Sequence, residues 1–236
     1  WDMLISQNGF SSETFRRAFD FKGEMLETGY PRNDRLLTGN TPGDINAIKK
    51  KLGLPYGKKV MLYAPTWRDD DSSGLGVYHF TCGLDIGLMK ENFGSEAVLA
   101  VKYHYLVKDN IDWSIYGNFV HVFDESTDIT DIYLASDILI TDYSSVMFDY
   151  SLLGRPMYFY CYDLARYKNV LRGFYFDFEE TAPGPVSLTT KQLVQDIKNG
   201  LSEKYKDKYD DFVEKYNPWD DGHAAEKIIE CLFKEG

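Results

Sequence analysis

Short apolar runs that alternate with helix-like segments constrain the fold of this chain more than any other feature of its sequence. Each run is a few residues long and mainly apolar, which is typical of strands whose sheet is covered on both faces. The runs are Val60–Ala64, Ala97–His104, Phe119–Phe123, Ile138–Ile140 and Met157–Cys161. Strands that alternate with helices predict parallel βαβ units with right-handed crossovers. We therefore expect an α/β fold with a parallel sheet and helices on both faces.

The helix-like segments and the turn residues indicate where the main domain begins. Helical patterns cover Thr41–Leu52, Leu84–Phe93, Asp131–Ala135, Thr190–Leu201, Glu203–Tyr216 and His223–Phe233. Residues 1–40 differ, because two short strand patterns flank the helix Ser11–Phe19 and turn residues follow at 29–34. We interpret residues 1–40 as the tail of a preceding domain plus a linker, and residues 41–236 as the main domain. Since the chain begins with Trp1 and not Met, we expect it to be a fragment of a longer protein.

The composition excludes several classes of protein. The formal net charge is −11, whereas a general nucleic-acid binder needs a basic field. We therefore expect no nucleic-acid partner, and we expect an anionic ligand to be held by a local cluster of cations and N–H groups. The three cysteines show no CxxC spacing, which argues against a disulfide framework or a zinc site and favours a reducing compartment. No apolar run approaches the ~20 residues needed to span a bilayer, and no signal peptide is present.

Polar residues follow the expected strands at the points where they end. Parallel strands end at one edge of a sheet, and open α/β sheets bind ligands outside that edge. The candidate ligand-binding residues at this edge are Thr66 and Arg68, Lys102 and His104, and Thr141, Asp142, Ser144 and Ser145.

Residues 136–156 form the most informative of these units, a strand, a turn and a helix with two serines at the helix start. A helix start exposes free backbone N–H groups and the positive end of the helix dipole, both of which suit a phosphate. The alternative is that Ser144 only caps the helix, as serines at helix starts commonly do. The sequence alone leaves both interpretations open.

His104 and Arg172 are further candidates for chemistry. His104 ends a strand, where a neutral imidazole accepts a proton and a charged one stabilises a phosphate oxyanion; the alternative is a structural histidine bonded to a loop carbonyl. Arg172 and Gly173 open an aromatic loop, and the Arg fork suits a pyrophosphate, although stacking on an aromatic ring is equally compatible. The chain has no Walker A motif, no GxGxxG and no clustered His and Cys for a metal site.

An ordered series of motifs resembles one enzyme family. The motifs are Tyr63–Arg68, Asp128–Tyr133, Ser136–Tyr150, Arg172–Asp177 and Asp220–Glu226, with the linker motif Gly29–Asp34 before them. Together they resemble the CDP-glycerol:poly(glycerophosphate) glycerophosphotransferases of wall teichoic acid synthesis, over nearly the whole chain. That family is similar to two-domain GT-B glycosyltransferases. The resemblance therefore implies the Rossmann-like C-terminal domain, which holds the CDP-alcohol donor, with a remnant of the acceptor domain.

The resemblance also implies roles for individual residues. The donor pyrophosphate would be surrounded by Ser144, Ser145, Arg172 and the region of Asp221 and Gly222. His104 would match the catalytic histidine of the C-terminal domain. The family's other histidine, which would accept the proton, lies in a His-Gly-Thr-Pro motif that this chain does not contain.

The implied activity is transfer of glycerol phosphate from CDP-glycerol to a lipid-linked (poly)glycerophosphate acceptor, with release of CMP. The resemblance implies no cofactor, and a need for a divalent metal stays open. It also implies a cytoplasmic location with peripheral contact at the inner face of the cell membrane, and it allows a homo-oligomer. Two other classes also stay open: a UDP-sugar enzyme of the UDP-N-acetylglucosamine epimerase type, which shares the fold, and a non-catalytic nucleotide- or membrane-docking module. The sequence separates neither glycerol from ribitol phosphate nor a primase from a polymerase.

Overall fold

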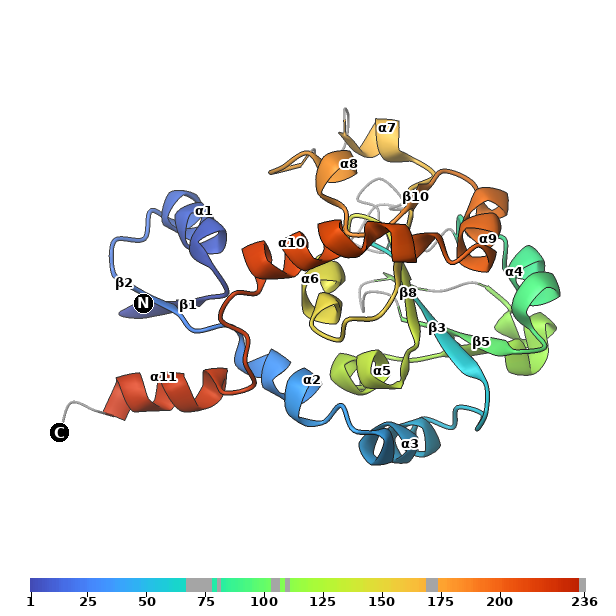
Figure 1. Cartoon of the computed structure of the whole chain (residues 1–236), viewed down its shortest axis with the longest axis horizontal. Helices are drawn as coiled ribbons and strands as arrows, with labels where there is room; N and C mark the ends of the chain where they lie inside the picture. Colours follow the sequence, from blue (N-terminus) through green and yellow to red (C-terminus); the bar gives the residue numbers. More distant parts are fainter. Residues whose placement is uncertain (67–77, 80–81, 103–106, 109–110, 169–173, 234–236) are drawn as a thin grey trace.

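The computed structural model describes residues 1–66, 78–79, 82–102, 107–108, 111–168 and 174–233. Its centre is a six-stranded sheet in which every neighbouring pair is parallel. In spatial order the strands are β10 (Val186–Ser187), β9 (Met157–Tyr160), β8 (Ile138–Thr141), β3 (Lys59–Ala64), β5 (Ala97–Val101) and β7 (Val120–Val122). The α/β fold is confirmed, and each expected strand of the sheet has a counterpart (Figure 1). The strand expected over Ala97–His104 is shorter than expected, because β5 ends at Val101, and His104 lies outside the described residues.

Alternate residues of the sheet pack into separate hydrophobic clusters, one on each face. Along β3, Val60 and Leu62 belong to one cluster, while Met61 and Tyr63 belong to the other, as the two-residue period of a strand requires. The helices that pack into the first cluster are α2 (Asp34–Thr38), α3 (Pro42–Lys51), α5 (Ile129–Ala135), α6 (Val146–Ser151), α8 (Phe178–Thr181) and α10 (Lys206–Tyr216). Those that pack into the second are α4 (Ile86–Phe93), the 3-10 helix η2 (Trp113–Phe119) and α9 (Thr190–Lys198). Helices therefore cover both faces of the sheet.

A smaller unit precedes the sheet domain. Strands β1 (Met3–Ser6) and β2 (Glu24–Glu27) pair in parallel, and α1 (Gly9–Phe19) connects them; we call these three elements the amino-terminal unit. The chain then passes through the 3-10 helix η1 (Pro31–Asn33) and α2 into α3. The last helix, α11 (Ala224–Phe233), contacts η1 and lies away from the sheet, below the amino-terminal unit in Figure 1.

The start of α11 is capped by a residue from a distant part of the chain. The backbone N–H groups of Ala224 and Ala225 donate to the two carboxylate oxygens of Asp34, at 2.8 and 2.9 Å. Asp221, which precedes the helix, instead accepts from the N–H of His223 at 3.1 Å. Carboxylates at a helix start satisfy free N–H groups and complement the helix dipole. Asp34 therefore joins α11 to α2.

Several short elements have no counterpart in the sequence-based expectation. They are α2, η2, α8, β10, α7 (Leu164–Arg166) and the pair β4 (Tyr78–His79) with β6 (Val107–Lys108). The expected helix Glu203–Tyr216 is divided into η4 (Leu201–Tyr205) and α10. Elements this short carry too few residues for a periodic pattern, so pairing and packing define them.

Candidate functional site

The order of the strands places a switch point between β3 and β8. From β3 the chain moves outward to β5 and β7, and it then returns to β8 on the other side of β3. In open α/β sheets, the crevice at such a reversal, outside the carboxyl ends of the two strands, is the usual ligand site. The residues that follow β3 and β8 lie at this reversal, and they include Thr66, Ser144 and Ser145.

Three hydrogen bonds that involve side chains join the ends of β3 and β8. One carboxylate oxygen of Asp142, Oδ1, accepts from the N–H of Thr66 at 2.8 Å and from its hydroxyl at 2.6 Å. One residue earlier, the hydroxyl of Thr141 donates to the carbonyl oxygen of Ala64 at 2.7 Å. Thr141 and Asp142 are 0% and 2% exposed. The structure thus brings together Thr66, Thr141 and Asp142, which link the ends of the two strands. Their contact with a ligand stays a prediction.

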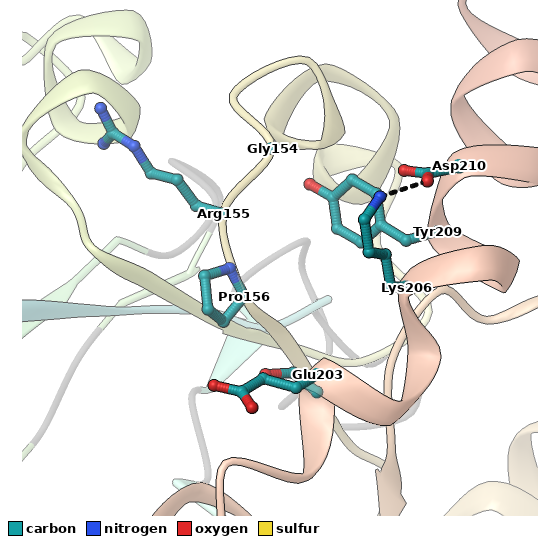
Figure 2. A pocket seen from close by; sticks show the side chains of 8 residues that line it. Gly154, Arg155, Pro156, Glu203, Lys206, Tyr209 and Asp210 are labelled. Atoms are coloured by element: carbon teal, nitrogen blue, oxygen red, sulfur yellow. Dashed lines mark hydrogen bonds and ion pairs between the residues drawn. The ribbon is translucent and has the colours of Figure 1, made fainter.

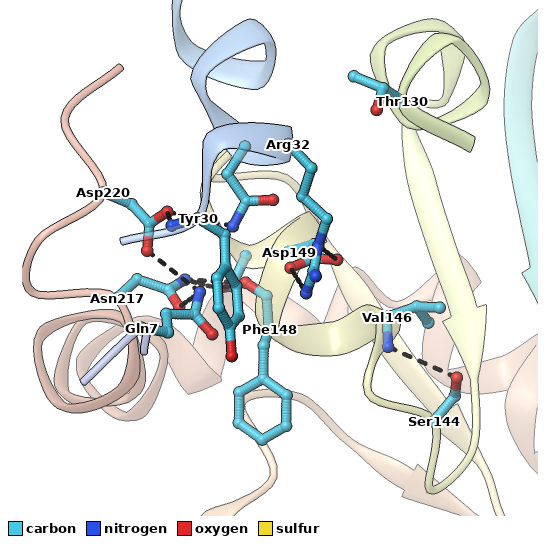
Figure 3. A network of polar contacts seen from close by, with 12 residues as sticks. Gln7, Tyr30, Arg32, Thr130, Ser144, Val146, Phe148, Asp149, Asn217 and Asp220 are labelled. Carbon is cyan, nitrogen blue, oxygen red and sulfur yellow. Dashed lines mark hydrogen bonds and ion pairs between the residues drawn. The ribbon is translucent and has the colours of Figure 1, made fainter. Parts of the chain in front are cut away.

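Ser144 and Ser145 precede α6 without forming a close capping bond. Ser144 is half-buried and Ser145 is exposed. Ser145 is the N-cap residue, yet within the described residues its side chain makes no capping bond. The Ser144 hydroxyl accepts from the N–H of Val146 only at 3.5 Å (Figure 3), beyond the usual range of a hydrogen bond. The geometry therefore gives the capping interpretation only weak support. The hydroxyl groups of Ser144 and Ser145 lie at the switch point as potential hydrogen-bond donors to a ligand.

Lys102, at the end of β5, holds the loop that follows β7. Its ammonium group donates to the carbonyl oxygen of Asp124 and, at 3.3 Å, to that of Thr127. Burial lowers the pKa of Lys102, and the carboxylates of Asp124 and Glu125 oppose this effect. Asp124 closes the loop further by accepting from the N–H and the hydroxyl of Ser126, at 3.0 and 2.6 Å. Lys102 therefore orders a loop at the ligand edge, and its contact with a donor stays a prediction.

An aromatic cluster fixes the turn between β8 and α6. The ring of Tyr143 stacks on Tyr167 with a centroid separation of 4.1 Å, and it contacts Phe174 and Phe178 at 5.3 and 5.4 Å. The Tyr143 hydroxyl donates to Asp163 at 3.2 Å. Sequence reasoning did not identify this cluster, although the density of Phe over residues 174–178 is a signal that could have indicated it. The cluster holds the residue between Asp142 and Ser144 in place.

Asp221 and Gly222 lie between α10 and α11, and their contacts are with that region. Asp221 accepts from the ammonium group of Lys227 at 2.7 Å, and this hydrogen bond lowers the pKa of the Asp221 carboxyl. Gly222 has a φ of +89°, and a Cβ there would lie 3.2 Å from Thr38. Among the described residues, no recorded hydrogen bond joins either of them to the residues that follow β3 and β8. Their place in the donor site stays a prediction.

The remaining candidates are Arg68, His104, Arg172 and Gly173, which lie outside the described residues. Their roles stay predictions.

Of the other histidines, His121 on β7 has a buried Nε2 without a hydrogen-bond partner in the described ranges, and burial lowers the pKa of its ring. Within those ranges no three His, Cys, Asp or Glu side chains are grouped as metal ligands. No helix there combines the length and the apolar character needed to cross a bilayer.

A cavity of about 290 Å³ lies next to the start of β9, at the opposite edge of the sheet (Figure 2). It is lined by Gly154, Arg155, Pro156, Ser202, Glu203, Lys206, Tyr209 and Asp210. Lys206 is paired with Asp210, and Arg155 donates to the carbonyl oxygens of Tyr133 and Leu134 at 3.2 and 2.9 Å. Since open α/β sheets bind ligands at the carboxyl edge, this cavity is separate from the candidate site.

Parallel strands, helices on both faces and polar groups at the switch point define a Rossmann-like α/β domain. Comparison with known proteins then identifies its family. Residues 1–234 match the family model described as CDP-Glycerol:Poly(glycerophosphate) glycerophosphotransferase. The chain belongs to this family, which confirms the resemblance found in the sequence motifs.

The relatives that it matches are longer proteins. The chain is 44% identical over 236 residues to the teichoic acid poly(glycerol phosphate) polymerase of Bacillus subtilis (strain 168), a match that covers 99% of this chain and 32% of that protein. The structure of a variant of the wall teichoic acid polymerase TagF, soaked with CDPG, has a TM-score of 0.90 at 38% identity and covers 100% of this chain and 58% of that one. This chain spans 32% to 61% of the length of the curated relatives that it matches first.

The epimerase likeness is one of fold alone. A UDP-GlcNAc 2-epimerase from Neisseria meningitidis, solved with UDP-GlcNAc, has a TM-score of 0.55 at 15% identity over 98% of this chain and 60% of its own. The comparison supports the GT-B-type Rossmann-like fold and carries no statement about substrate.

Proposed function

We propose that this chain is the donor-binding part of an enzyme that transfers glycerol phosphate from CDP-glycerol to a lipid-linked (poly)glycerophosphate acceptor and releases CMP. The family match over residues 1–234 supports this proposal, as does the similarity to the TagF variant soaked with CDPG. Such an enzyme would act at the inner face of the cell membrane, where a lipid-linked acceptor and a water-soluble donor meet.

The observation that carries the proposal is the pair of serines at the switch point. Ser144 and Ser145 precede α6 without a close capping bond, and hydroxyl and N–H donors beside the positive end of a helix dipole favour an anion. The chain carries a net charge of −11, so a diphosphate needs local donors of this kind. The proposal adds Arg172 and His104 as positive groups.

In the proposed reaction, the acceptor hydroxyl oxygen attacks the β-phosphorus of the donor in line. A new P–O bond forms while the bond between the β-phosphorus and the bridging oxygen breaks, and CMP leaves with that oxygen. Catalysis then depends mainly on positioning and on stabilising negative charge. Removal of one stabilising contact, from His104 for example, should raise the barrier by roughly 2–4 kcal/mol. The hydroxyl proton passes to a base that this chain does not contain, and the family resemblance makes that base the histidine of the His-Gly-Thr-Pro motif.

Calorimetry with CDP-glycerol, CTP and UDP-GlcNAc tests the donor site. We expect CDP-glycerol to bind, and Ser145→Ala to weaken its binding by about tenfold or more, because a hydrogen bond to a charged group contributes about 1.5–3 kcal/mol. The matched control is Ser95→Ala, since Ser95 is an exposed serine just before β5, at the opposite edge of the sheet. The affinity of Ser95→Ala for CDP-glycerol should equal that of the unmodified chain.

Two outcomes would contradict the proposal at different levels. If Ser145→Ala and Ser95→Ala bind CDP-glycerol equally well, the serine pair is not part of the donor site. If the unmodified chain binds no CDP-glycerol, the donor-binding function is excluded. For the chemical step, His104→Ala in the complete gene product should lower kcat by about 30- to 1,000-fold while the fold stays intact, as a loss of roughly 2–4 kcal/mol implies.

The UDP-sugar alternative is tested in the same experiment. The fold shared with the UDP-GlcNAc 2-epimerase is the observation that keeps it open. Tighter binding of UDP-GlcNAc than of CDP-glycerol would favour the epimerase-type function.

A further inference from the structure

Side chains from distant parts of the sequence meet beside α6 in one polar network (Figure 3). They come from the end of β1, from the segment that contains η1, from α6 and from the segment after α10. We call this set the junction network, and its members are Gln7, Tyr30, Arg32, Asn33, Asp149, Asn217 and Asp220.

Asp220 binds the segment between the amino-terminal unit and the sheet domain. One carboxylate oxygen, Oδ1, accepts from the N–H of Tyr30 and from the amide of Asn33, both at 3.1 Å. The other oxygen accepts from the amide of Gln7 at 3.1 Å. Gly29 has a φ of +77°, and a Cβ at this position would lie 3.0 Å from the Asp220 carboxyl. Glycine therefore permits this close approach.

Asn217 joins the end of β1 to α6. Its amide group donates to the carbonyl oxygen of Phe148 at 2.8 Å and to the hydroxyl of Ser151 at 2.7 Å, both on α6. Its carbonyl oxygen accepts from the amide of Gln7 at 2.7 Å. Asn217 is 4% exposed, so these bonds are shielded from water.

Arg32 makes the second connection to α6. Its guanidinium group donates through Nε and Nη2 to the two carboxylate oxygens of Asp149, at 3.1 and 3.2 Å, and it lies over the ring of Tyr30 at 4.3 Å. The Arg32 side chain is 59% exposed and that of Asp149 14%. Ion pairs of this exposure contribute little to stability, but two parallel hydrogen bonds from a planar fork fix an orientation.

We propose that the Arg32–Asp149 pair is a positioning device, which sets the orientation of the amino-terminal unit relative to the switch point. The helix that carries Asp149 starts directly after Ser144 and Ser145. The segment that carries Arg32 directly follows the amino-terminal unit. The inference rests on the proposed function. If the donor binds at the carboxyl ends of β3 and β8, this pair sets the position of the acceptor-binding part of the protein relative to the donor.

The expected effect is on turnover and not on donor affinity. A displacement of about 1 Å between reacting groups can reduce a rate by about 100-fold. Asp149→Asn keeps the shape of the side chain but removes its charge, and Arg32→Lys keeps the charge but removes the fork. We expect each to lower kcat by about 10- to 100-fold, while the Kd for CDP-glycerol stays within about twofold.

The test uses the complete gene product and three measurements. These are kcat with CDP-glycerol and acceptor, the Kd for CDP-glycerol by calorimetry, and hydrogen exchange of the amino-terminal unit. In Asp149→Asn and Arg32→Lys, amides of β1 and β2 should exchange faster. The control is Asp210→Asn, which removes the exposed ion pair with Lys206 on α10 and should change none of the three.

Each contrary result overturns the proposal in a distinct way. If kcat and exchange in Asp149→Asn equal those of Asp210→Asn, the pair positions nothing. If kcat falls and the Kd for CDP-glycerol rises in parallel, the pair supports donor binding through α6 and not orientation. If the unmodified protein binds no CDP-glycerol, the proposed function fails, and the exchange measurement alone then decides whether the pair holds the amino-terminal unit.

Discussion

Two buried tyrosines should respond in opposite directions to the loss of their hydroxyl groups. Tyr150, on α6, is 0% exposed, and its hydroxyl donates to the carbonyl oxygen of Ser136 at 3.1 Å. Tyr216, at the end of α10, is 1% exposed, and its hydroxyl has no hydrogen-bond partner in the part of the chain that the structure describes. Both rings pack against other aromatic rings, which a Phe would preserve. The two substitutions therefore isolate the hydroxyl group.

The structure gives the sign and the size of both effects. A buried hydroxyl without a partner costs about 1–3 kcal/mol, so Tyr216→Phe should raise the free energy of unfolding by about 1 kcal/mol. The hydrogen bond of Tyr150 contributes about 1 kcal/mol net, and the Ser136 oxygen keeps a donor from Arg155. Tyr150→Phe should therefore lower the free energy of unfolding by about 1 kcal/mol. The difference in stability between Tyr216→Phe and Tyr150→Phe corresponds to about 4–8 °C in Tm for a chain of this size.

Urea unfolding at 25 °C and thermal unfolding, both followed by circular dichroism, measure these changes. The unmodified chain is the reference, and equal m-values show that the comparison concerns stability alone. If Tyr216→Phe destabilises the chain as much as Tyr150→Phe does, the Tyr216 hydroxyl has a partner in solution and the reasoning is refuted.

Two further substitutions test other contacts. Asp131 is 1% exposed and paired with Arg35 and Lys51; burial raises its pKa, but the hydrogen bonds from these partners outweigh burial and the pKa is lowered. Asp131→Asn should therefore lower the free energy of unfolding by about 2 kcal/mol at pH 7, as measured by urea unfolding. This difference from the unmodified chain should shrink as the pH falls below about 4, because the lowered pKa contributes stability only while the carboxyl is ionised. A difference that does not depend on pH would contradict this reasoning. Gly29→Ala should destabilise more than Gly53→Ala, because both glycines have positive φ but only Gly29 meets a carboxyl group; thermal unfolding compares them, and equal losses would show that the contact is unimportant.

The strands could be predicted because burial on both faces leaves a simple pattern. Val98, Leu99 and Ala100 of β5 are all 0% exposed, so the run is apolar without alternation. The turn and helix after β8 could be predicted for a related reason, since polar and turn residues interrupt the apolar pattern there. The convergence of polar residues at one edge then followed from parallel pairing.

Contacts between distant residues could not be predicted from local patterns. Asp142 and Asp149 are close in sequence, yet Asp142 accepts from Thr66 while Asp149 pairs with Arg32. The bond from Ala224 to Asp34 joins residues 190 positions apart. Nothing in the neighbouring residues specifies such partners, because tertiary packing brings them together. For the same reason, the sequence suggested a ligand for Lys102 but not the loop that Lys102 holds.

The aromatic segment 174–176 has a consequence for molecular recognition. Phe174 packs against Tyr143, while Phe176, two residues later, packs against Phe10 and Tyr216. Tyr175 between them is 76% exposed. Phe174 and Phe176 anchor the backbone on either side of Tyr175. A molecule that stacks on the Tyr175 ring would therefore bind a segment whose backbone is already ordered, and the loss of conformational entropy on binding would be small.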